Sequence, residues 1–275
     1  MKTMTKIIAS ALLIAAGYLS LVWGAENTLT LATTTSTYDT GLLDVLLPPF
    51  ESQCKCKVKV IAVGTGQALR TARDGNADVV LVHDRAAEEQ FVADGFGVKR
   101  HDVMYNDFVL VGPSEDPAKI SGTKDAVGAF GTISRSGALF ASRADESGTH
   151  KKELAIWKKA GLTPTGPSYL QVGSGMAATL RVANEKGAYC LADRGTWLAH
   201  KKELTHLAVI VEKDPILLNY YSVIAVSPDK HPKVNAGAAG KFIEFLTGSK
   251  GQKIIRDFGK DKYGEPLFTP NAGQK

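Results

Sequence analysis

The sequence predicts an α/β protein made of two lobes that are connected by two crossover strands. Two observations support this fold class. Strand-like and helix-like segments alternate along the chain, which is the pattern of parallel βαβ units. Two strand-like segments of similar sequence, residues 104–111 (MYNDFVLV) and 219–226 (NYYSVIAV), bracket a block of about 110 residues with this alternation. A separate apolar segment precedes them at the N-terminus.

The N-terminal segment has the layout of a secretory signal peptide. Lys2 and Lys6 are followed by an apolar stretch without charge from residue 7 to residue 23, and then by the small residues Gly24 and Ala25. The stretch is short for a membrane span, which takes about 20 apolar residues. The first Cys is Cys54, so no lipid-anchored N-terminus is expected. We therefore expect residues 1–24 to be a signal peptide and the mature protein to be periplasmic.

The composition is that of a globular protein, with 44% hydrophobic and 22% charged residues. The formal net charge of +5 falls to +3 when Lys2 and Lys6 are removed, which is too weak to indicate nucleic-acid binding and is compatible with an anionic ligand. The chain has three Cys residues, so at least one thiol stays unpaired within the chain. Only one residue separates Cys54 from Cys56, which argues against a bridge between them, and the Cys residues show no zinc-site spacing.

The predicted first lobe begins with short alternating elements. Residues 57–63 begin with Lys and Val in alternation, a period of two that indicates a strand. Gly64 and Gly66 break this pattern, and a helix follows to about residue 74. The same reasoning predicts strands over residues 29–32 and 77–82, and helices over residues 41–50 and 85–94.

Between the two crossover strands the alternation resumes. The predicted strands here are residues 138–142, 169–172 and 188–191, and the predicted helices are residues 148–160, 175–186 and 194–201. Each crossover strand carries an Asn and a Tyr at its start and is followed by a Pro. We assign residues 25–106 and 220–275 to lobe I and residues 107–219 to lobe II. The alternative is one continuous doubly wound sheet.

Candidate ligand residues lie in strand-to-helix turns, because ligands of open α/β sheets bind at the carboxyl ends of strands and face helix N-termini. In the turn of residues 142–150, Arg143 offers a fork of donors for an oxyanion, and the helix entrance from Ser147 to Thr149 adds hydroxyl and backbone N–H groups. The hydroxyl-rich turn of residues 33–37 and two glycine-containing turns supply further donors. Together the four turns predict an oxyanion site between the lobes, with these candidate residues: Thr34, Thr35, Ser36, Thr65, Gly66, Arg143, Ser147, Gly148, Thr149, Ser174 and Gly175.

Several segments of the chain also resemble a known family. They are ATTTSTYDTGLL (32–43), VGTGQAL (63–69), ADVVLVH (77–83), MYNDFVLVGP (104–113), SRADESGTHKKE (142–153) and GMAATLRVANEKGAYCLADRGT (175–196). Together they resemble the tungstate-binding proteins of bacterial tungstate ABC importers, the TupA family. The resemblance implies a class II periplasmic-binding fold, tungstate as ligand, an importer permease as partner, and anion contacts from residues 33–36, Arg143 and the 147–149 helix entrance. We expect a monomer without a cofactor, a resident metal or an enzymatic activity.

Three other interpretations remain open. Phosphate-binding proteins share the pattern Arg143-x-Asp145-x-Ser147-Gly148-Thr149, and phosphate keeps a proton at neutral pH, for which Asp145 is a possible acceptor. Tungstate carries no proton, so Asp145 would instead turn away and orient Arg143. Molybdate has the same charge and shape as tungstate. A secreted hydrolase is the third, although no metal-spaced His pair or catalytic triad is evident.

In the turn at residues 193–196, we interpret Arg194 as an ion-pair partner.

Overall fold

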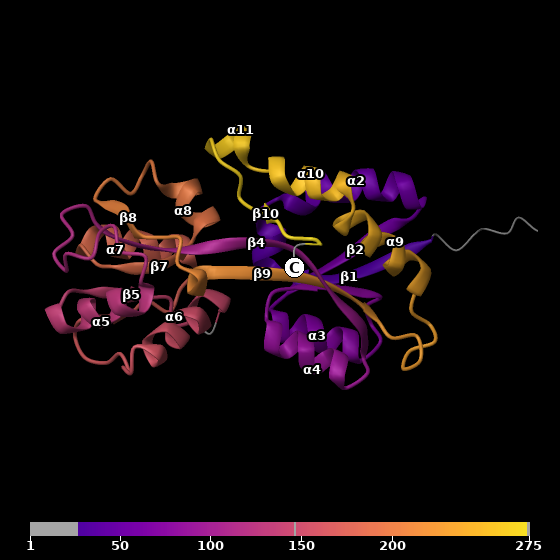
Figure 1. The fold of residues 1–275 in the computed structure, drawn as a ribbon, viewed down its shortest axis with the longest axis horizontal. Helices are drawn as coiled ribbons and strands as arrows, with labels where there is room; N and C mark the ends of the chain where they lie inside the picture. Colours follow the sequence, from indigo (N-terminus) through magenta and orange to yellow (C-terminus); the bar gives the residue numbers. More distant parts are fainter. Residues whose placement is uncertain (1–26, 146, 274–275) are drawn as a thin grey trace, which may run out of the picture.

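Two bodies joined by a pair of long strands make up the protein. The computed structural model describes residues 27–145 and 147–273. Figure 1 shows β4 (Gly97–Pro113) and β9 (Leu218–Val226) passing from one body into the other. The signal-peptide prediction for residues 1–24 lies outside the described residues. Within the described ranges, no helix has both the length and the apolar character that crossing a membrane requires.

The first body is a sheet covered by helices on both faces. β1 (Thr28–Thr34) pairs in parallel with β2 (Lys57–Val63) and β3 (Val79–Val82), and β3 pairs antiparallel with β9. The strand order is β10-β4-β9-β3-β1-β2, with β10 at Thr269–Pro270. In Figure 1, α2, α9 and α10 lie on one side of this sheet and α3 and α4 on the other. The helix bounds are α1 Thr35–Asp39, α2 Leu42–Cys54, α3 Thr65–Arg73, α4 Arg85–Ala93, α9 Ala236–Thr247, α10 Ser249–Asp257 and α11 Lys260–Tyr263.

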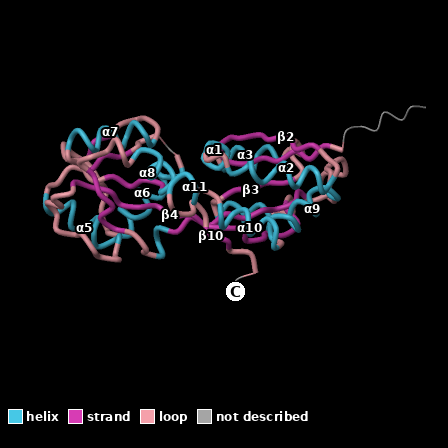
Figure 2. The backbone as a smooth tube through the Cα atoms, turned by 90° about the horizontal axis from the view of Figure 1, so that it is seen from above, coloured by secondary structure: helices cyan, strands magenta, loops and turns pink. Residues whose placement is uncertain are grey.

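The second body is built around the far end of β4. β7 (Cys190–Asp193) and β8 (Leu207–Val211) pair antiparallel with β4, while β5 (Phe140–Ser142) pairs in parallel with β6 (Tyr169–Gln171). Figure 2 shows the helices of each body around its own strands. The helices of this body are α5 Ala126–Ser136, α6 Gly148–Lys159, α7 Met176–Lys186, α8 Arg194–His200 and the short 3₁₀ helix η1 Pro215–Leu217.

Both predicted crossover segments are strands. Residues 104–107 pair antiparallel with residues 218–221, and the rest of β9 pairs with residues 97–102 of β4. β4 is longer than predicted, because it begins at Gly97 and pairs with strands of both bodies. Asn106 lies opposite Asn219 in this register, and the Asn219 Nδ2 donates to Asn106 Oδ1 at 2.9 Å. We retain as a proposal that lobe I (residues 25–106 and 220–275) and lobe II (residues 107–219) separate at this pair.

Buried apolar residues form three clusters. The largest runs from the α2 side of the first body to α7 and β7 of the second. A smaller cluster in the first body lies between the sheet and helices α3 and α4. The third fills the second body around the packed rings of Phe130, Phe140 and Trp157, whose centroids are 4.6 to 5.2 Å apart. Each body therefore has apolar packing of its own, and the largest cluster also ties the two together.

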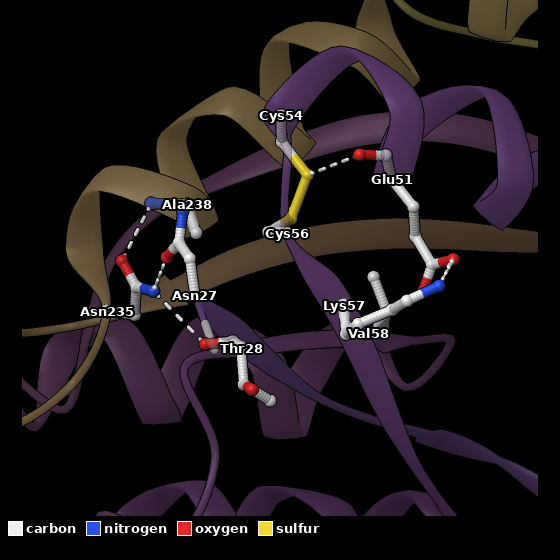
Figure 3. Close-up of a disulfide and its surroundings, with 9 residues drawn as sticks. All are labelled: Asn27, Thr28, Glu51, Cys54, Cys56, Lys57, Val58, Asn235 and Ala238. Atoms are coloured by element: carbon white, nitrogen blue, oxygen red, sulfur yellow. Dashed lines mark hydrogen bonds and ion pairs between the residues drawn. A yellow bond between two sulfur atoms is a disulfide. The ribbon is translucent and has the colours of Figure 1, made fainter. Parts of the chain in front are cut away.

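A disulfide joins Cys54 and Cys56, and the expectation that these residues do not bridge each other is wrong. Lys55 lies in the left-handed region with φ 53°, so the chain reverses between the end of α2 and the start of β2. The two Cα atoms are consequently 5.2 Å apart, within the usual range for a disulfide. Figure 3 shows Glu51 beside it, whose carboxylate accepts from the Val58 N–H at 2.8 Å. The third cysteine, Cys190, is buried as a free thiol.

Candidate functional site

A cleft of about 770 Å³ lies at the junction of the two bodies. Strand ends and helix N-termini of the first body line one side, and the entrance of α6 lines the other. Of the predicted ligand residues, the structure brings eight to this cleft: Thr34, Thr35, Thr65, Gly66, Arg143, Ser147, Gly148 and Thr149. The cleft therefore gathers residues from three of the four predicted turns.

The hydroxyl-rich turn divides into structural and cleft-facing groups. Thr33 is buried and its Oγ1 donates to the Leu81 carbonyl at 2.7 Å, which ties β1 to β3. Thr34 caps α1, since its Oγ1 accepts from the Thr37 N–H at 3.3 Å. Thr35 is exposed and lines the cleft. Ser36 lies in α1, but its side chain is outside the described structure, so its predicted contact stays a prediction.

The glycine-containing turn between β2 and α3 presents backbone rather than side chains. Gly64 is the N-cap of α3 and supplies no side-chain cap. Thr65 and Gly66, the first residues of α3, line the cleft. Gly64 makes no side-chain cap hydrogen bond at this helix entrance, and the first N–H groups of a helix favour an anion.

Arg143 and Asp145 form the charged centre of the second side. The Arg143 Nε donates to Asp145 Oδ2 at 3.0 Å, and Nη2 donates to the same oxygen. The other carboxylate oxygen accepts from the Ser147 N–H at 3.2 Å. Partial burial opposes ionisation of Asp145, but the hydrogen bonds from Ser147 and Arg143 outweigh it and lower its pKa. Asp145 is thus ionised and accepts hydrogen bonds from Arg143, which is the arrangement that the predicted orienting role requires.

The entrance of α6 presents Ser147, Gly148 and Thr149. Ser147 is the N-cap, and its Oγ accepts from the His150 N–H at 3.3 Å. Thr149 is buried at the cleft wall and Gly148 is exposed to it. A Cβ added at Gly148 would lie 3.2 Å from Cε1 of His83, so glycine lets the two bodies approach closely at this point.

The fourth predicted turn does not reach the cleft. Ser174 and Gly175 are absent from the described residues that line it. Ser174 instead donates its N–H to the Arg143 carbonyl at 3.3 Å, and Gly175 is the N-cap of α7. The turn therefore contacts the Arg143 loop, and the predicted anion contacts of Ser174 and Gly175 stay a prediction.

Sequence reasoning missed His83, which follows β3 and lines the cleft. Its ring centroid is 4.8 Å from that of Tyr221, and its side chain is hydrogen-bonded to Asn219. Burial lowers the pKa of His83 to about 4, although the bond to Asn219 acts in the opposite direction. The ring is therefore neutral at physiological pH. His83 directly follows a predicted strand. The rule that ligands bind at the carboxyl ends of strands, which selected the other turns, could therefore have selected His83 as well.

Two further cations make contacts within the second body, beside its junction with the first. Lys152 donates from Nζ to the carbonyls of Ile216 and Leu218, at 3.1 and 3.2 Å, which ties α6 to the start of β9. Arg194 pairs with Asp107 at 2.6 Å and with Glu212 at 2.8 Å. The interpretation of Arg194 as an ion-pair partner agrees with this geometry. Among the described residues, no group of three or more His, Cys, Asp or Glu is arranged to hold a metal ion.

Comparison with known proteins identifies the family. The PBP superfamily domain matches residues 23–250. The tungstate-binding protein TupA of Peptoclostridium acidaminophilum is 54% identical over 91% of this chain and 88% of its own length. The chain belongs to the TupA family. The solved structure of the tungstate-binding protein TupA from Desulfovibrio alaskensis superposes with a TM-score of 0.83 and 44% identity, over 89% of this chain and 99% of that chain.

A second solved structure supports the same assignment. It is that of the tungstate ABC transporter protein from Geobacter sulfurreducens, with a TM-score of 0.73 and 52% identity over 84% of this chain and 98% of that chain. The α/β periplasmic-binding fold predicted from the sequence is therefore confirmed, as is the resemblance to the TupA family. A putative ABC transporter anion-binding protein of Haloferax volcanii is 52% identical over 90% of this chain and 73% of its own length.

Two cleft-region groups of this TupA-family protein make opposing contributions to stability. The pKa of His83 is lowered from 6.5 to about 4, so the unfolded chain binds more protons and stability rises with pH across that window. Burial raises the pKa of Glu153 from 4.5 to about 7, so the native state binds more protons and stability falls as pH rises between those values. Each group changes the free energy of unfolding by at most about 3 kcal/mol across its pH window. In the unliganded protein the two opposite pH dependences largely cancel.

Removing one of the two groups should expose the contribution of the other. We expect His83→Asn to have an unfolding free energy that falls between pH 4.5 and about 7, and Glu153→Gln to have one that rises between about pH 4 and 6.5. Urea unfolding of each variant at several pH values measures these slopes. Parallel pH profiles for wild type and both variants would contradict the assignment.

Proposed function

We propose that this protein binds tungstate in the cleft between its two bodies and delivers it to the membrane permease of an ABC importer. The two TupA relatives that share 54% and 41% identity with it are tungstate-binding proteins. In this proposal the protein acts in the periplasm after cleavage of residues 1–24, as a monomer without a catalytic activity. Thr34, Thr35, Ser36, Thr65, Gly66, Arg143, Ser147, Gly148 and Thr149 are its proposed ligand residues.

The observation that carries the proposal is the supply of hydrogen-bond donors at the cleft, together with the engagement of the described carboxylates beside it in hydrogen bonds of their own. Six Lys and Arg residues line the cleft: Arg70, Arg85, Arg143, Lys151, Lys152 and Lys159. Among the described residues, two carboxylates also line it. Each accepts from the first turn of a helix: Asp84 from the Ala87 N–H at 3.2 Å, and Asp193 from the Thr196 N–H at 2.8 Å.

The nearby Asp145 is likewise engaged, by Arg143 and Ser147. An anion that carries no proton needs only donors, whereas monohydrogen phosphate also needs an acceptor. This arrangement therefore favours tungstate or molybdate over phosphate, and the named relatives favour tungstate of the two.

Calorimetric titration of the mature, ligand-stripped protein with tungstate, molybdate, phosphate and sulfate tests the proposal. We expect one-to-one binding of tungstate in the nanomolar range, since a half-dozen hydrogen bonds to a charged ligand of about 1.5–3 kcal/mol each can support it after ordering costs. Phosphate should be silent. Tight phosphate binding would place the protein among phosphate carriers and make Asp145 a ligand. Silence for all four anions would reject the proposal and reopen the hydrolase interpretation.

A further inference from the structure

A buried carboxylate lies directly behind the proposed anion loop. Glu153 is on α6, four residues after Thr149, and both side chains are buried, at 2% and 6% exposed. Four residues of helix advance about 6 Å along the axis and return to the same face. The Glu153 carboxylate is therefore about one turn below the helix entrance that lines the cleft.

Hydrogen bonds connect this carboxylate to the backbone that places Arg143. Glu153 Oε1 accepts from the Tyr169 hydroxyl at 2.7 Å and from Trp157 Nε1 at 3.2 Å, and the Ser142 hydroxyl is also hydrogen-bonded to the carboxylate. The same Ser142 Oγ accepts from the Ala144 N–H at 3.2 Å. Ala144 has a φ of 48°, a strained position for a residue with a Cβ, and it lies between Arg143 and Asp145. Glu153 thus supports the conformation of the loop through Ser142.

The network around Glu153 can accept one additional proton without leaving a polar group unpaired. Hydroxyl groups both donate and accept, so Ser142 can turn its hydrogen from Glu153 to the oxygen of Tyr169, to which it is also hydrogen-bonded. A protonated Glu153 then donates to Ser142 Oγ and still accepts from Tyr169 and Trp157. The carboxylate and carboxylic acid forms are both compatible with the observed packing.

An oxyanion in the cleft changes the balance between these two forms. Glu153 is close enough to interact electrostatically with Asp145, and both Glu153 and Arg143 act on the buried thiol of Cys190. A dianion at the α6 entrance adds negative charge on the same side, which favours the neutral form of Glu153. The chargeable groups facing Glu153 from neighbouring elements are Tyr169 of β6, Cys190 of β7 and the Arg143–Asp145 pair of the loop.

We propose that Glu153 is a positioning residue that takes up a proton when the cleft binds its dianion and releases the proton when the anion leaves. The proton comes from the solvent and returns to it, so the carboxylate becomes a carboxylic acid and no other bond changes. This inference rests on the proposed function, because it needs a dianion at Arg143 and the α6 entrance.

The inference has a measurable consequence near neutral pH. Burial raises the pKa of Glu153 to about 7 in the unliganded protein, so the group titrates where binding is measured. If the bound anion raises this pKa by about one unit, affinity changes about tenfold between the low-pH and high-pH limits, and about half a proton is taken up per anion midway between the two pKa values. Binding therefore weakens as pH rises.

Titration calorimetry with tungstate in two buffers of different ionisation enthalpy measures proton uptake directly. For the wild type at about pH 7.5 we expect uptake of about half a proton. For Glu153→Gln we expect uptake close to zero and, at about pH 8.5, affinity about tenfold tighter than that of the wild type, because the amide resembles the neutral acid. A role limited to packing does not tighten binding. Far-ultraviolet circular dichroism and the melting temperature establish that the variant is folded.

A second variant and a control keep the test independent of the folding of Glu153→Gln. Tyr169→Phe removes a donor to the carboxylate, which raises the pKa of Glu153 further, so the pH of maximal uptake should move upward. Leu154→Ala truncates an exposed, uncharged side chain of the same helix and should retain the uptake. Wild-type binding of tungstate without uptake, or undiminished uptake in Glu153→Gln, overturns the inference and leaves the proposed function intact. Absence of tungstate binding overturns both.

Discussion

Arg143→Ala is expected to weaken tungstate binding at least about 100-fold. Arg143 is held by Asp145 through Nε and Nη2, so among the described residues its Nη1 group has no hydrogen-bond partner and is available to a ligand in the cleft. Hydrogen bonds to charged groups contribute about 1.5–3 kcal/mol each, and the variant also leaves Asp145 without its cation near a dianion. Calorimetric titration at neutral pH measures the loss.

Two further substitutions show whether the effect belongs to this site. Arg135→Ala removes an exposed Arg on α5 whose described hydrogen bond is to Thr132, and it should bind as the wild type does. Arg143→Lys keeps the charge but not the planar fork that pairs with Asp145, so its affinity should fall between those of Arg143→Ala and the wild type. Unchanged affinity in Arg143→Ala, in a folded protein, would remove Arg143 from the proposed ligand set.

Trp157→Ala is expected to lower the free energy of unfolding by about 3–5 kcal/mol, the usual range for emptying a buried aromatic site. The Trp157 side chain is 3% exposed and lies edge-on to the rings of Phe130 and Phe140, with centroids 4.6 and 5.1 Å away. Its Nε1 also donates to the buried Glu153 carboxylate. The substitution therefore creates a cavity in the second body and removes one of the donors of a buried charge. Urea unfolding measures the change.

The same helix provides the matched control. Leu154→Ala truncates a side chain that is 41% exposed on α6, and it should cost less than about 1 kcal/mol. Trp157→Phe retains most of the packing but not the donor, and it should fall between the two. Equal losses for Trp157→Ala and Leu154→Ala would contradict the position of Trp157 in the core.

The alternation of elements was predictable from the sequence, because the periods of strand and helix depend on local apolar spacing. Helix α2 illustrates the limit of this reasoning. It was predicted to end at Phe50, but it continues to Cys54, and both Phe50 and Cys54 are packed in the core. The C-terminal helices α9 and α10 were not predicted. Both pack against α2, which is distant in sequence, and α9 also packs against β9.

The candidate site was predictable to the level of turns but not of single atoms. The rule that ligands bind at strand ends selected Thr35, Gly66 and the α6 entrance, all of which line the cleft. The same rule selected Ser174, which lies behind the Arg143 loop, because the sequence does not show how deeply a short strand is set in the fold. The role of Glu153 depends on neighbours from β5 and β6, so no local pattern could indicate it.

The buried thiol of Cys190 has a practical consequence for following motion between the two bodies. Its side chain is fully buried, and burial raises its pKa well above the usual value, so the reactive thiolate is scarce at neutral pH. Cys54 and Cys56 are consumed by their mutual bond. Maleimide dyes should therefore leave the native protein unlabelled, and a pair of cysteines introduced on the surface, one in each body, would carry a fluorescent donor and acceptor without any background to subtract.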